Sequence, residues 1–322
     1  MTGAGALPKY ADLPTPDGMR APSSWGLWGR DDRCGALNLI TGERIRAGAA
    51  EVRKGAAFPL NLELELPDPP LSERPRFGYR VVPVAAGLGN DDEYDKFNPQ
   101  ASSQIDGFAH VRHPRLGFYN GLEREKHGMH HWARRGIAAR GVLADVAAWR
   151  ERQGRPLVQG TTDPVTPQDL LATLDAQGSA VEPGDVLLIR TGFVTWYRGL
   201  GRAEREAFTA DLRMPGLAQG AEMAQVLWDL HPSLVAADNM ALEVWPPRAD
   251  PGLLMDDPDA AEERFLHVAL IPLLGIPVGE LWDLDGLAAD CAADGRYSCQ
   301  VVSAPMNKEG GIATMANALA VK

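Results

Sequence analysis

An aspartate and a histidine in the first half of the chain have the types and spacing of metal ligands. The stretch QIDGFAH, residues 104–110, places Asp106 four residues before His110 and two residues after Gln104. If the segment is helical, a spacing of four puts the carboxylate and the imidazole on one face. Oxygen and imidazole ligands suit Zn²⁺, Mn²⁺ or Fe²⁺. Such a pair also arises by chance, so a metal site requires further ligands from elsewhere in the chain.

A second histidine and a glutamate lie in apolar sequence much later in the chain. His267 stands in FLHVAL, and Glu280 ends the run LLGIPVGE. A lone buried histidine is more often a hydrogen-bonded core residue than a ligand. A buried glutamate, however, is costly unless it is paired or bound to a cation. Together, residues 104–110 and 267–280 predict a site with an Asp, a Glu and two His, for one metal ion or a pair.

The other five histidines favour structural roles. His127, His130 and His131 lie in a polar stretch before an expected helix, which indicates surface or capping residues. His113 and His231 each precede a proline, as is typical of turns. The chain has no GxSxG elbow, no GxxxxGK[ST] loop and no GxGxxG motif that opens a helix after a strand. Metal chemistry is therefore better supported than these competing chemistries.

Strands and helices must alternate to bring the two stretches together. Thr41 is expected to cap a helix that runs to about Lys54, and other helices are expected at 167–177, 216–230 and 265–275. The apolar patterns predict strands at 58–66, 141–146, 186–190, 233–239, 298–305 and 316–322. Residues 67–76 are expected to form a proline-rich loop and 86–99 a mobile surface loop. This mixture predicts an α/β layered domain with one core at 36–322, preceded by an extended arm at 1–35.

Composition limits the classes of partner. Hydrophobic residues make up 45% of the 322 residues, enough for a large core, and the net charge of −11 disfavours nucleic acid and anionic membranes. The most apolar window, FLHVALIPLLGIPVGELW, contains a histidine, a glutamate and two prolines, which a membrane span would not carry. Three cysteines without a CxxC pair, and no visible signal peptide, predict a cytoplasmic protein that acts on a small molecule.

Longer blocks of sequence resemble the metal-dependent cyclase family, which includes bacterial kynurenine formamidases and isatin hydrolases. Its signature is HxGTHxDxPxH, and this chain reads QASSQIDGFAH from Gln100 when aligned on Asp106 and His110. Gln100 and Gln104 stand where the family has its first two histidines, and Phe108 stands in place of the proline. The blocks WGRDDRCGALNLIT, EPGDVLLIRTG and HVALIPLLGIPVGELWDLDG are similar to the family's longer members, so the resemblance extends from about residue 25 to the C-terminus.

The resemblance implies a swivelling β/β/α domain that assembles as a homodimer or homotetramer. Asp106, His267 and Glu280 fall on the family's metal ligands. His110 falls on a ligand or acid/base histidine, and His267 is a second catalytic candidate. Gln104 occupies the place of a ligand histidine, and an amide oxygen is a harder ligand than imidazole. The implied cofactor is Mn²⁺ or Zn²⁺, with Mn²⁺ favoured.

By the same resemblance, we expect a hydrolase that cleaves an amide, lactam or ester bond of a cyclic or N-acyl substrate through metal-activated water. Phe118, Tyr119 and Asn120 are candidates for the substrate pocket, and the loop with Tyr94 is expected to close over it. Loss of two signature histidines leaves two alternatives: a cyclase or dehydratase of a secondary metabolite, or a non-catalytic binding protein.

Overall fold

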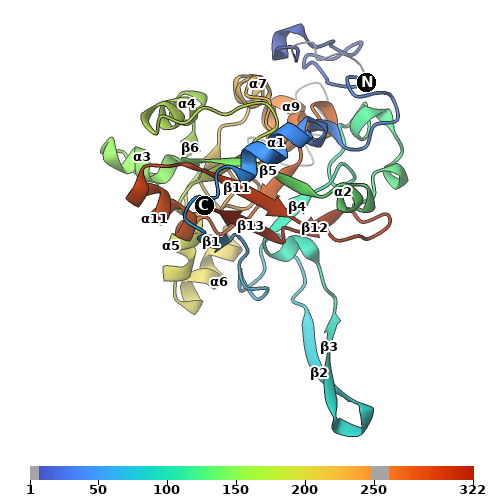
Figure 1. Ribbon diagram of the computed structural model, residues 1–322, viewed down its shortest axis with the longest axis vertical. Helices are drawn as coiled ribbons and strands as arrows, with labels where there is room; N and C mark the ends of the chain where they lie inside the picture. The colour runs from blue at the N-terminus through green and yellow to red at the C-terminus, as the bar shows by residue number, and fades with distance from the viewer. Residues whose placement is uncertain (1–6, 248–260) are drawn as a thin grey trace.

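A computed structural model describes residues 7–247 and 261–322, which form a mixed α/β protein (Figure 1). Within these residues, nine strands make one curled sheet in the order β1-β13-β11-β5-β7-β9-β10-β4-β12. The four strands from β5 to β10 are parallel, and the other neighbours are antiparallel. The strands are β1 (Ala57–Pro59), β4 (Gln104–Asp106), β5 (Ile137–Asp145), β7 (Val186–Arg190), β9 (Leu234–Ala237), β10 (Val278–Glu280), β11 (Ser298–Ser303), β12 (Ala313–Met315) and β13 (Ala318–Val321).

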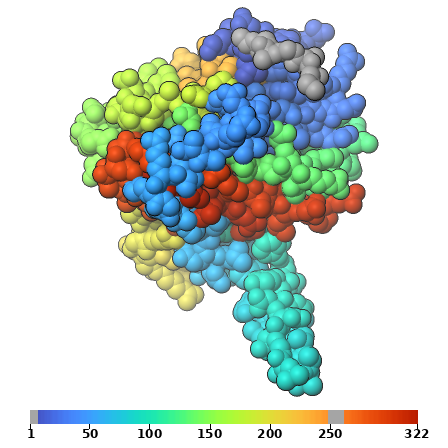
Figure 2. Space-filling view, in the orientation of Figure 1, coloured from blue at the N-terminus to red at the C-terminus, as the bar shows by residue number. Residues whose placement is uncertain are grey.

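Helices surround the sheet, and one hairpin extends away from it. The helices are α1 (Gly42–Ala49), α2 (His130–Arg135), α3 (Val146–Arg152), α4 (Pro167–Ala176), α5 (Phe193–Gly199), α6 (Arg202–Ala210), α7 (Ala221–Asp229), α9 (Ala261–Arg264), α10 (Leu266–Val268), a π turn (Ala269–Leu273) and α11 (Asp285–Asp294). Short 3₁₀ turns lie at Tyr10–Asp12, Gly35–Leu39, Ala85–Gly87, Pro99–Ala101, Tyr119–Gly121 and Arg124–Lys126. Strands β6 (Pro164–Val165) and β8 (Gly216–Leu217) form a small pair, whereas β2 (Gly78–Val84) and β3 (Gly89–Asp95) form a hairpin that projects from the body (Figure 2).

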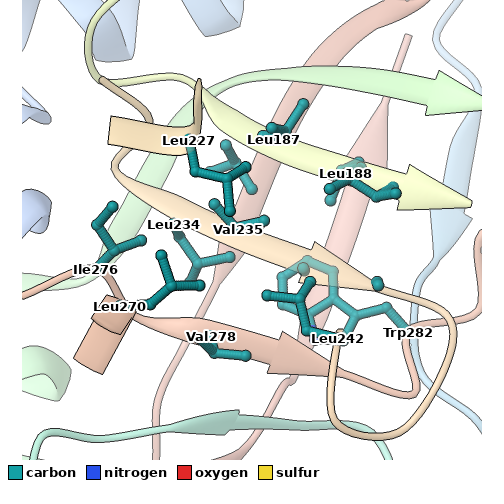
Figure 3. Packing of buried hydrophobic residues seen from close by; sticks show 14 of the residues in the cluster. Leu187, Leu188, Leu227, Leu234, Val235, Leu242, Leu270, Ile276, Val278 and Trp282 are labelled. Carbon is teal, nitrogen blue, oxygen red and sulfur yellow. The ribbon is translucent and has the colours of Figure 1, made fainter. Parts of the chain in front are cut away.

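The parallel strands form because their sequences are apolar on both faces. Leu187 and Leu188 on β7 and Val235 on β9 are fully buried. Figure 3 shows these side chains packed with Leu227, Leu270 and others of the same cluster. Continuous apolar runs are typical of parallel strands that helices cover on both sides. This core holds β9 and β10 in fixed positions, and β10 ends with one of the candidate ligands.

Most of the predicted elements are confirmed. The strands expected from 141, 186, 233, 298 and 316 correspond to β5, β7, β9, β11 and β13, and the helix expected at 167–177 is α4. The Thr41 hydroxyl accepts a hydrogen bond from the Arg44 N–H, as a helix cap does. In the part of the chain that the structure describes, no helix is long and apolar enough to cross a membrane.

Several boundaries are wrong, each for a local reason. The first helix ends at Ala49 rather than near Lys54, and the helix expected from residue 216 begins at Ala221, after β8. The strand expected at 58–66 stops at Pro59, and Asn61 instead pairs with Trp282. The helix expected at 265–275 is a short α10 followed by a π turn that contains Pro272, which has no N–H to donate.

The expected mobile loop at 86–99 is a further correction, because residues 89–95 form strand β3. The polar sequence GNDDEYD is extended because it pairs along its whole length with β2. The swivelling β/β/α architecture and the arm boundary at residue 35 stay predictions. Residues 1–6 of that arm lie outside the described residues.

Candidate metal centre

Two neighbouring strands carry three of the candidate ligands. In the antiparallel pair β4–β10, Gln104 lies opposite Glu280, and Asp106 lies opposite Val278. Side chains two residues apart on a strand share a face, so Gln104 and Asp106 point to the same side. Glu280 joins them there, because its carboxylate accepts a hydrogen bond from the Gln104 amide. The register of β4 against β10 therefore brings together residues that are 176 positions apart.

His267 completes a cluster that could bind a cation. One ligand atom each from Asp106, His267 and Glu280 lies within 4.8 Å of the other two. All three side chains are buried, and their residues are at most 3% exposed. The predicted meeting of the 104–110 and 267–280 stretches is confirmed for these three residues.

Two glutamine amides hold the carboxylates of this cluster. The Gln104 Nε2 atom donates to Glu280 Oε2 over 2.5 Å and lies 3.4 Å from Asp106 Oδ2. The Gln100 Nε2 atom donates to Asp106 Oδ1 over 2.7 Å and lies 3.0 Å from His110 Nδ1. The two glutamines that align with histidines in the signature of the similar family therefore both reach the site.

His110 lies at the edge of the cluster, but not for the reason that its spacing suggests. The segment is not helical, so the condition for a shared helical face is not met. Asp106 ends β4, and a turn follows in which the His110 N–H donates to the Gly107 carbonyl. The turn nevertheless leaves His110 Nε2 3.8 Å from Asp106 Oδ1. Its side chain is 28% exposed and that of His267 is 2% exposed, so His110 is the accessible imidazole of the cluster.

Glu243, in the loop after β9, is a site residue that the sequence analysis missed. Its Oε1 atom lies 2.9 Å from His267 Nδ1, and its carboxylate also accepts hydrogen bonds from the N–H groups of Leu266 and His267. Histidines that bind metals are usually oriented by such a carboxylate on the other ring nitrogen. Glu243 lies in the apolar stretch MALEV and is fully buried, so the argument used for Glu280 would have identified it.

Burial and hydrogen bonds within the cluster shift the pKa values of its members in opposite directions. Burial alone would lower the pKa of His267, but the hydrogen bonds to Glu243 and Glu280 raise it to about 10. Burial would raise the pKa of Glu280, but the hydrogen bond to His267 lowers it to about 2. Burial raises the pKa of Asp106 above its ordinary value. His267 and Glu280 thus form an ion pair, and a metal ion on His267 Nε2 would have to displace the proton from that atom. Asp106 is the carboxylate that is costly to ionise.

A half-buried arginine adds positive charge near the cluster. Arg74 donates a hydrogen bond to the Gln100 carbonyl oxygen, and its charge favours the ionised forms of both Asp106 and Glu280. Arg74 lies in the proline-rich stretch 67–76, where its sequence surroundings predict no role in the site.

The side chains present fit one divalent cation. Two carboxylates and one imidazole are common ligands of Zn²⁺ and Mn²⁺. Within the described residues, the buried Gln104 Oε1 atom accepts no hydrogen bond, so rotation of this amide would supply an oxygen as a fourth ligand. Burial makes the Asp106 carboxylate costly to ionise, and a cation beside it would offset that cost.

The four predicted substrate-binding residues lie elsewhere or have other contacts. Tyr119 is buried and donates to Asp32, and the Asn120 amide bonds to Gly26, Gly29 and Arg30, so both hold the N-terminal segment. Phe118 is half-buried beside them. Tyr94 lies on the hairpin against Phe77, Tyr79 and Phe97. Among the described contacts, none joins these four side chains to the ligand cluster, and their substrate role stays a prediction.

The surface reading of the HGMHH histidines is wrong for two of them. His127 and His130 are buried, because His127 bonds through Nε2 to the Tyr119 carbonyl and His130 packs beside Gly310. The structural reading of His113 agrees with its contacts, since it is buried and lies 3.4 Å from Glu262.

Comparisons with known proteins bear on the family and the fold. A family profile described as "Putative cyclase" matches residues 55–244. A solved structure described as a novel cyclase is 30% identical over 93% of this chain and 99% of its own, with a TM-score of 0.79. Isatin hydrolase A from Ralstonia solanacearum is 17% identical (86% and 96% covered, TM-score 0.57), and that from Labrenzia aggregata is 14% identical (86% and 97%, 0.55). The search of curated proteins found no match.

Proposed function

The chain belongs to the Putative cyclase family, and from that premise we propose that it is a metal-dependent hydrolase. Its reaction would cleave an amide, lactam or ester bond in a cyclic or N-acyl substrate. The observation that carries this proposal is the buried cluster of Asp106, His267 and Glu280. The isatin hydrolases that share the fold support a cyclic substrate.

We assign the roles of the residues from their burial and contacts. Asp106, Glu280 and the Nε2 atom of His267 would hold the cation, with the Gln104 amide oxygen as a fourth ligand. A divalent cation at this position supplies Lewis acidity for a carbonyl and lowers the pKa of water. His110 is exposed enough to accept a proton from the attacking water and return it to the leaving group. His267 lies between two glutamates, so we assign it as a ligand rather than a proton carrier.

We propose that the substrate binds in a cavity of about 280 Å³ lined by Ala101, the residue after Gln100 in the chain, and by Pro67, Phe77 and Tyr79. The charged residues Glu65, Asp68 and Arg76 also line this cavity. An aromatic or cyclic acyl group fits such a lining. We propose that substrates of this kind are preferred over small polar amides.

The ligand set also indicates which divalent cation the site prefers. Three oxygen ligands and one nitrogen favour Mn²⁺ over Zn²⁺. We further propose that the protein assembles as a homodimer or homotetramer, as the family resemblance implies. We also propose that it acts in the cytoplasm, because its three scattered cysteines fit a reducing setting.

Metal analysis with reconstitution tests the proposal. Purified protein would be assayed for bound metal, then stripped with a chelator and supplied with Mn²⁺ or Zn²⁺. Hydrolysis would be followed with isatin, an N-formylaniline and an aryl lactone. We expect activity on at least one substrate to disappear on chelation and to return with Mn²⁺. Activity that survives confirmed removal of the metal would contradict the mechanism.

A second candidate is a metal-independent cyclase or dehydratase. The specific observation in its favour is that the carboxylate oxygens of Asp106 and Glu280 already lie within hydrogen-bonding range of Gln100, Gln104 or His267. In that case His110 would act as a general acid or base without a cation. Asp106→Asn would then be tolerated while His110→Asn would not, whereas a metal hydrolase needs both residues.

A further inference from the structure

Gln104 lies at the centre of the cluster, and its side chain has two different ends. The Nε2 end contacts a carboxylate oxygen of Glu280 and one of Asp106, as a bridging cation would. The Oε1 end is buried and has no hydrogen-bond partner among residues 7–247 and 261–322. Nearly all buried polar atoms in folded proteins are paired, so an unpartnered amide oxygen in a fully buried residue requires an explanation.

Rotation about the last side-chain bond would exchange these two ends without changing the shape of the side chain. The oxygen would then face the carboxylates, which is unfavourable unless a cation lies between them. After the rotation, Nε2 would occupy the place that Oε1 has now, which has no hydrogen-bond partner among the described residues. The rotation therefore changes only which amide atom faces Asp106 and Glu280. The favoured orientation therefore depends on whether a cation is present.

The surroundings restrict movement to the amide itself. The Trp282 indole N–H donates to the Gln104 carbonyl oxygen over 2.9 Å, and β4 is paired with β10 on one side and β12 on the other. The backbone of Gln104 is thus fixed, and rotation of the amide group is the simplest way to present Oε1.

We propose that Gln104 determines which cation this site binds, by rotating its amide from a donor that links Asp106 to Glu280 into an oxygen ligand. This inference rests on the proposed metal-dependent function and adds its selectivity. An amide oxygen is a hard ligand that suits Mn²⁺ and Mg²⁺, whereas an imidazole nitrogen suits Zn²⁺. With Gln104 at this position, the site discriminates against Zn²⁺. Any divalent cation must also displace the hydrogen bond from Gln104 to Glu280 before it binds.

The test compares metal affinities of the stripped wild type, Gln104→His and Gln104→Met by calorimetry with Mn²⁺ and Zn²⁺. We expect Gln104→His to shift the Zn²⁺:Mn²⁺ affinity ratio at least about tenfold toward Zn²⁺. Gln104→Met lacks the amide and should weaken Mn²⁺ binding about tenfold or more. Gln153→His, at an exposed position, is the matched control and should leave both affinities unchanged.

A second measurement uses the wild type and does not depend on the folding of a variant. The side-chain amide protons of Gln104 would be followed by NMR during titration with diamagnetic Mg²⁺, and their signal would be identified by its loss in Gln104→Met. We expect a large shift of this signal on binding. If the wild type binds metal with no change of this signal and no change of the affinity ratio in Gln104→His, the inference is wrong and the proposed function stands. If the wild type binds no divalent cation, both are wrong.

Discussion

At the scale of single residues, the centre depends on how His267 is held. Its Nδ1 atom faces Glu243 and its Nε2 atom faces Glu280, at 2.9 and 3.1 Å. Phe265 stacks on the same ring, with the two planes inclined by 13°. A ring fixed on both edges and one face has little freedom to turn. The Nε2 atom is therefore presented to the carboxylates in a single orientation, which is the arrangement that a preorganised metal ligand needs.

Glu243→Gln should weaken metal binding without removing any proposed ligand. The amide is a poorer acceptor for the His267 N–H, so the ring loses its electrostatic support and part of its orientation. We expect Mn²⁺ affinity to fall by about 10- to 100-fold, as measured by calorimetry on the stripped protein. Glu222→Gln, at an exposed helix position, is the control. Equal affinities for the two variants would show that Glu243 does not orient a ligand.

A second prediction at this scale concerns His127 and acid stability. Burial lowers the pKa of His127 to about 4, although the hydrogen bond to the Tyr119 carbonyl opposes this. The His127 side chain therefore stays neutral between pH 6.5 and 4 in the folded state, whereas in the unfolded state it takes up a proton over this range. The contribution of neutral His127 to the free energy of unfolding is complete above pH 6.5. It is lost as the pH falls toward 4, which lowers the free energy of unfolding by about 3 kcal/mol at most.

His127→Gln should consequently reduce the loss of stability between pH 6.5 and 4. The measurement is the free energy of unfolding from urea titrations at several pH values, for the variant and the wild type. Only the difference between the two curves is diagnostic, because the buried Asp238 titrates in the same range with a raised pKa, about 6, and with the opposite sign. Parallel curves would contradict the assignment.

Charge within apolar sequence was a usable signal for site residues, although Glu243 in MALEV carried it and was missed. Residues without that signal were not recognised. His267 and Glu280 were recognised because burial of a charged group demands a partner. Arg74 lies in a loop of prolines and charged residues, where nothing in the local pattern distinguishes a site residue from a solvated one. Gln100 was aligned with a signature position, but only the turn at Pro99–Ala101 reveals that its amide reaches Asp106.

At the scale of elements, the site depends on close contact between β9 and β10. Gly279 lies between Val278 and Glu280, opposite Ala236 of the neighbouring strand. A Cβ atom at this position would lie 2.6 Å from the Ala236 Cβ and 2.8 Å from the Trp282 indole nitrogen. The glycine therefore lets Trp282 cover the sheet and keep its hydrogen bond to Gln104.

Gly279→Val should separate these strands and damage the site together with the fold. Overpacking of a well-packed core typically costs about 1–3 kcal/mol, and a β-branched side chain here has no space to move. We expect a lower free energy of unfolding and weaker Mn²⁺ binding in the same variant. Gly199→Ala is the matched control, because a Cβ atom there meets nothing within 4 Å. A Gly279→Val protein as stable as this control would refute the packing argument.

Helices and strands were predictable where their own residues determine the secondary structure. The strand VLLIR and the capped helix at Pro167–Ala176 carry their signals locally. The hairpin strand β3 does not, since its acidic sequence is a poor strand former and becomes extended only by pairing with β2. The order of strands in the sheet is likewise invisible locally, because β4 pairs with strands near the other end of the chain.

At the scale of the whole molecule, the β2–β3 hairpin stands apart from the body (Figures 1 and 2). Within the described residues its main contacts are between its own two strands and the turn that joins them. It exposes Tyr79, Val81 and Leu88, with Leu88 92% exposed. An isolated two-stranded hairpin is at best marginally stable in water, and exposed apolar groups that cluster usually mark an interaction surface.

We therefore expect the hairpin to contribute to self-association of this chain. The triple variant Tyr79→Ser, Val81→Ser and Leu88→Ser removes apolar surface without touching the core. Light scattering after size exclusion should show a dimer or tetramer for the wild type and a smaller species for this variant, with unchanged melting temperature. Val158→Ser, which alters an equally exposed valine outside the hairpin, should assemble as the wild type does. A monomeric wild type, or a triple variant of wild-type mass, would exclude this role, and the exposed residues would then require a different partner.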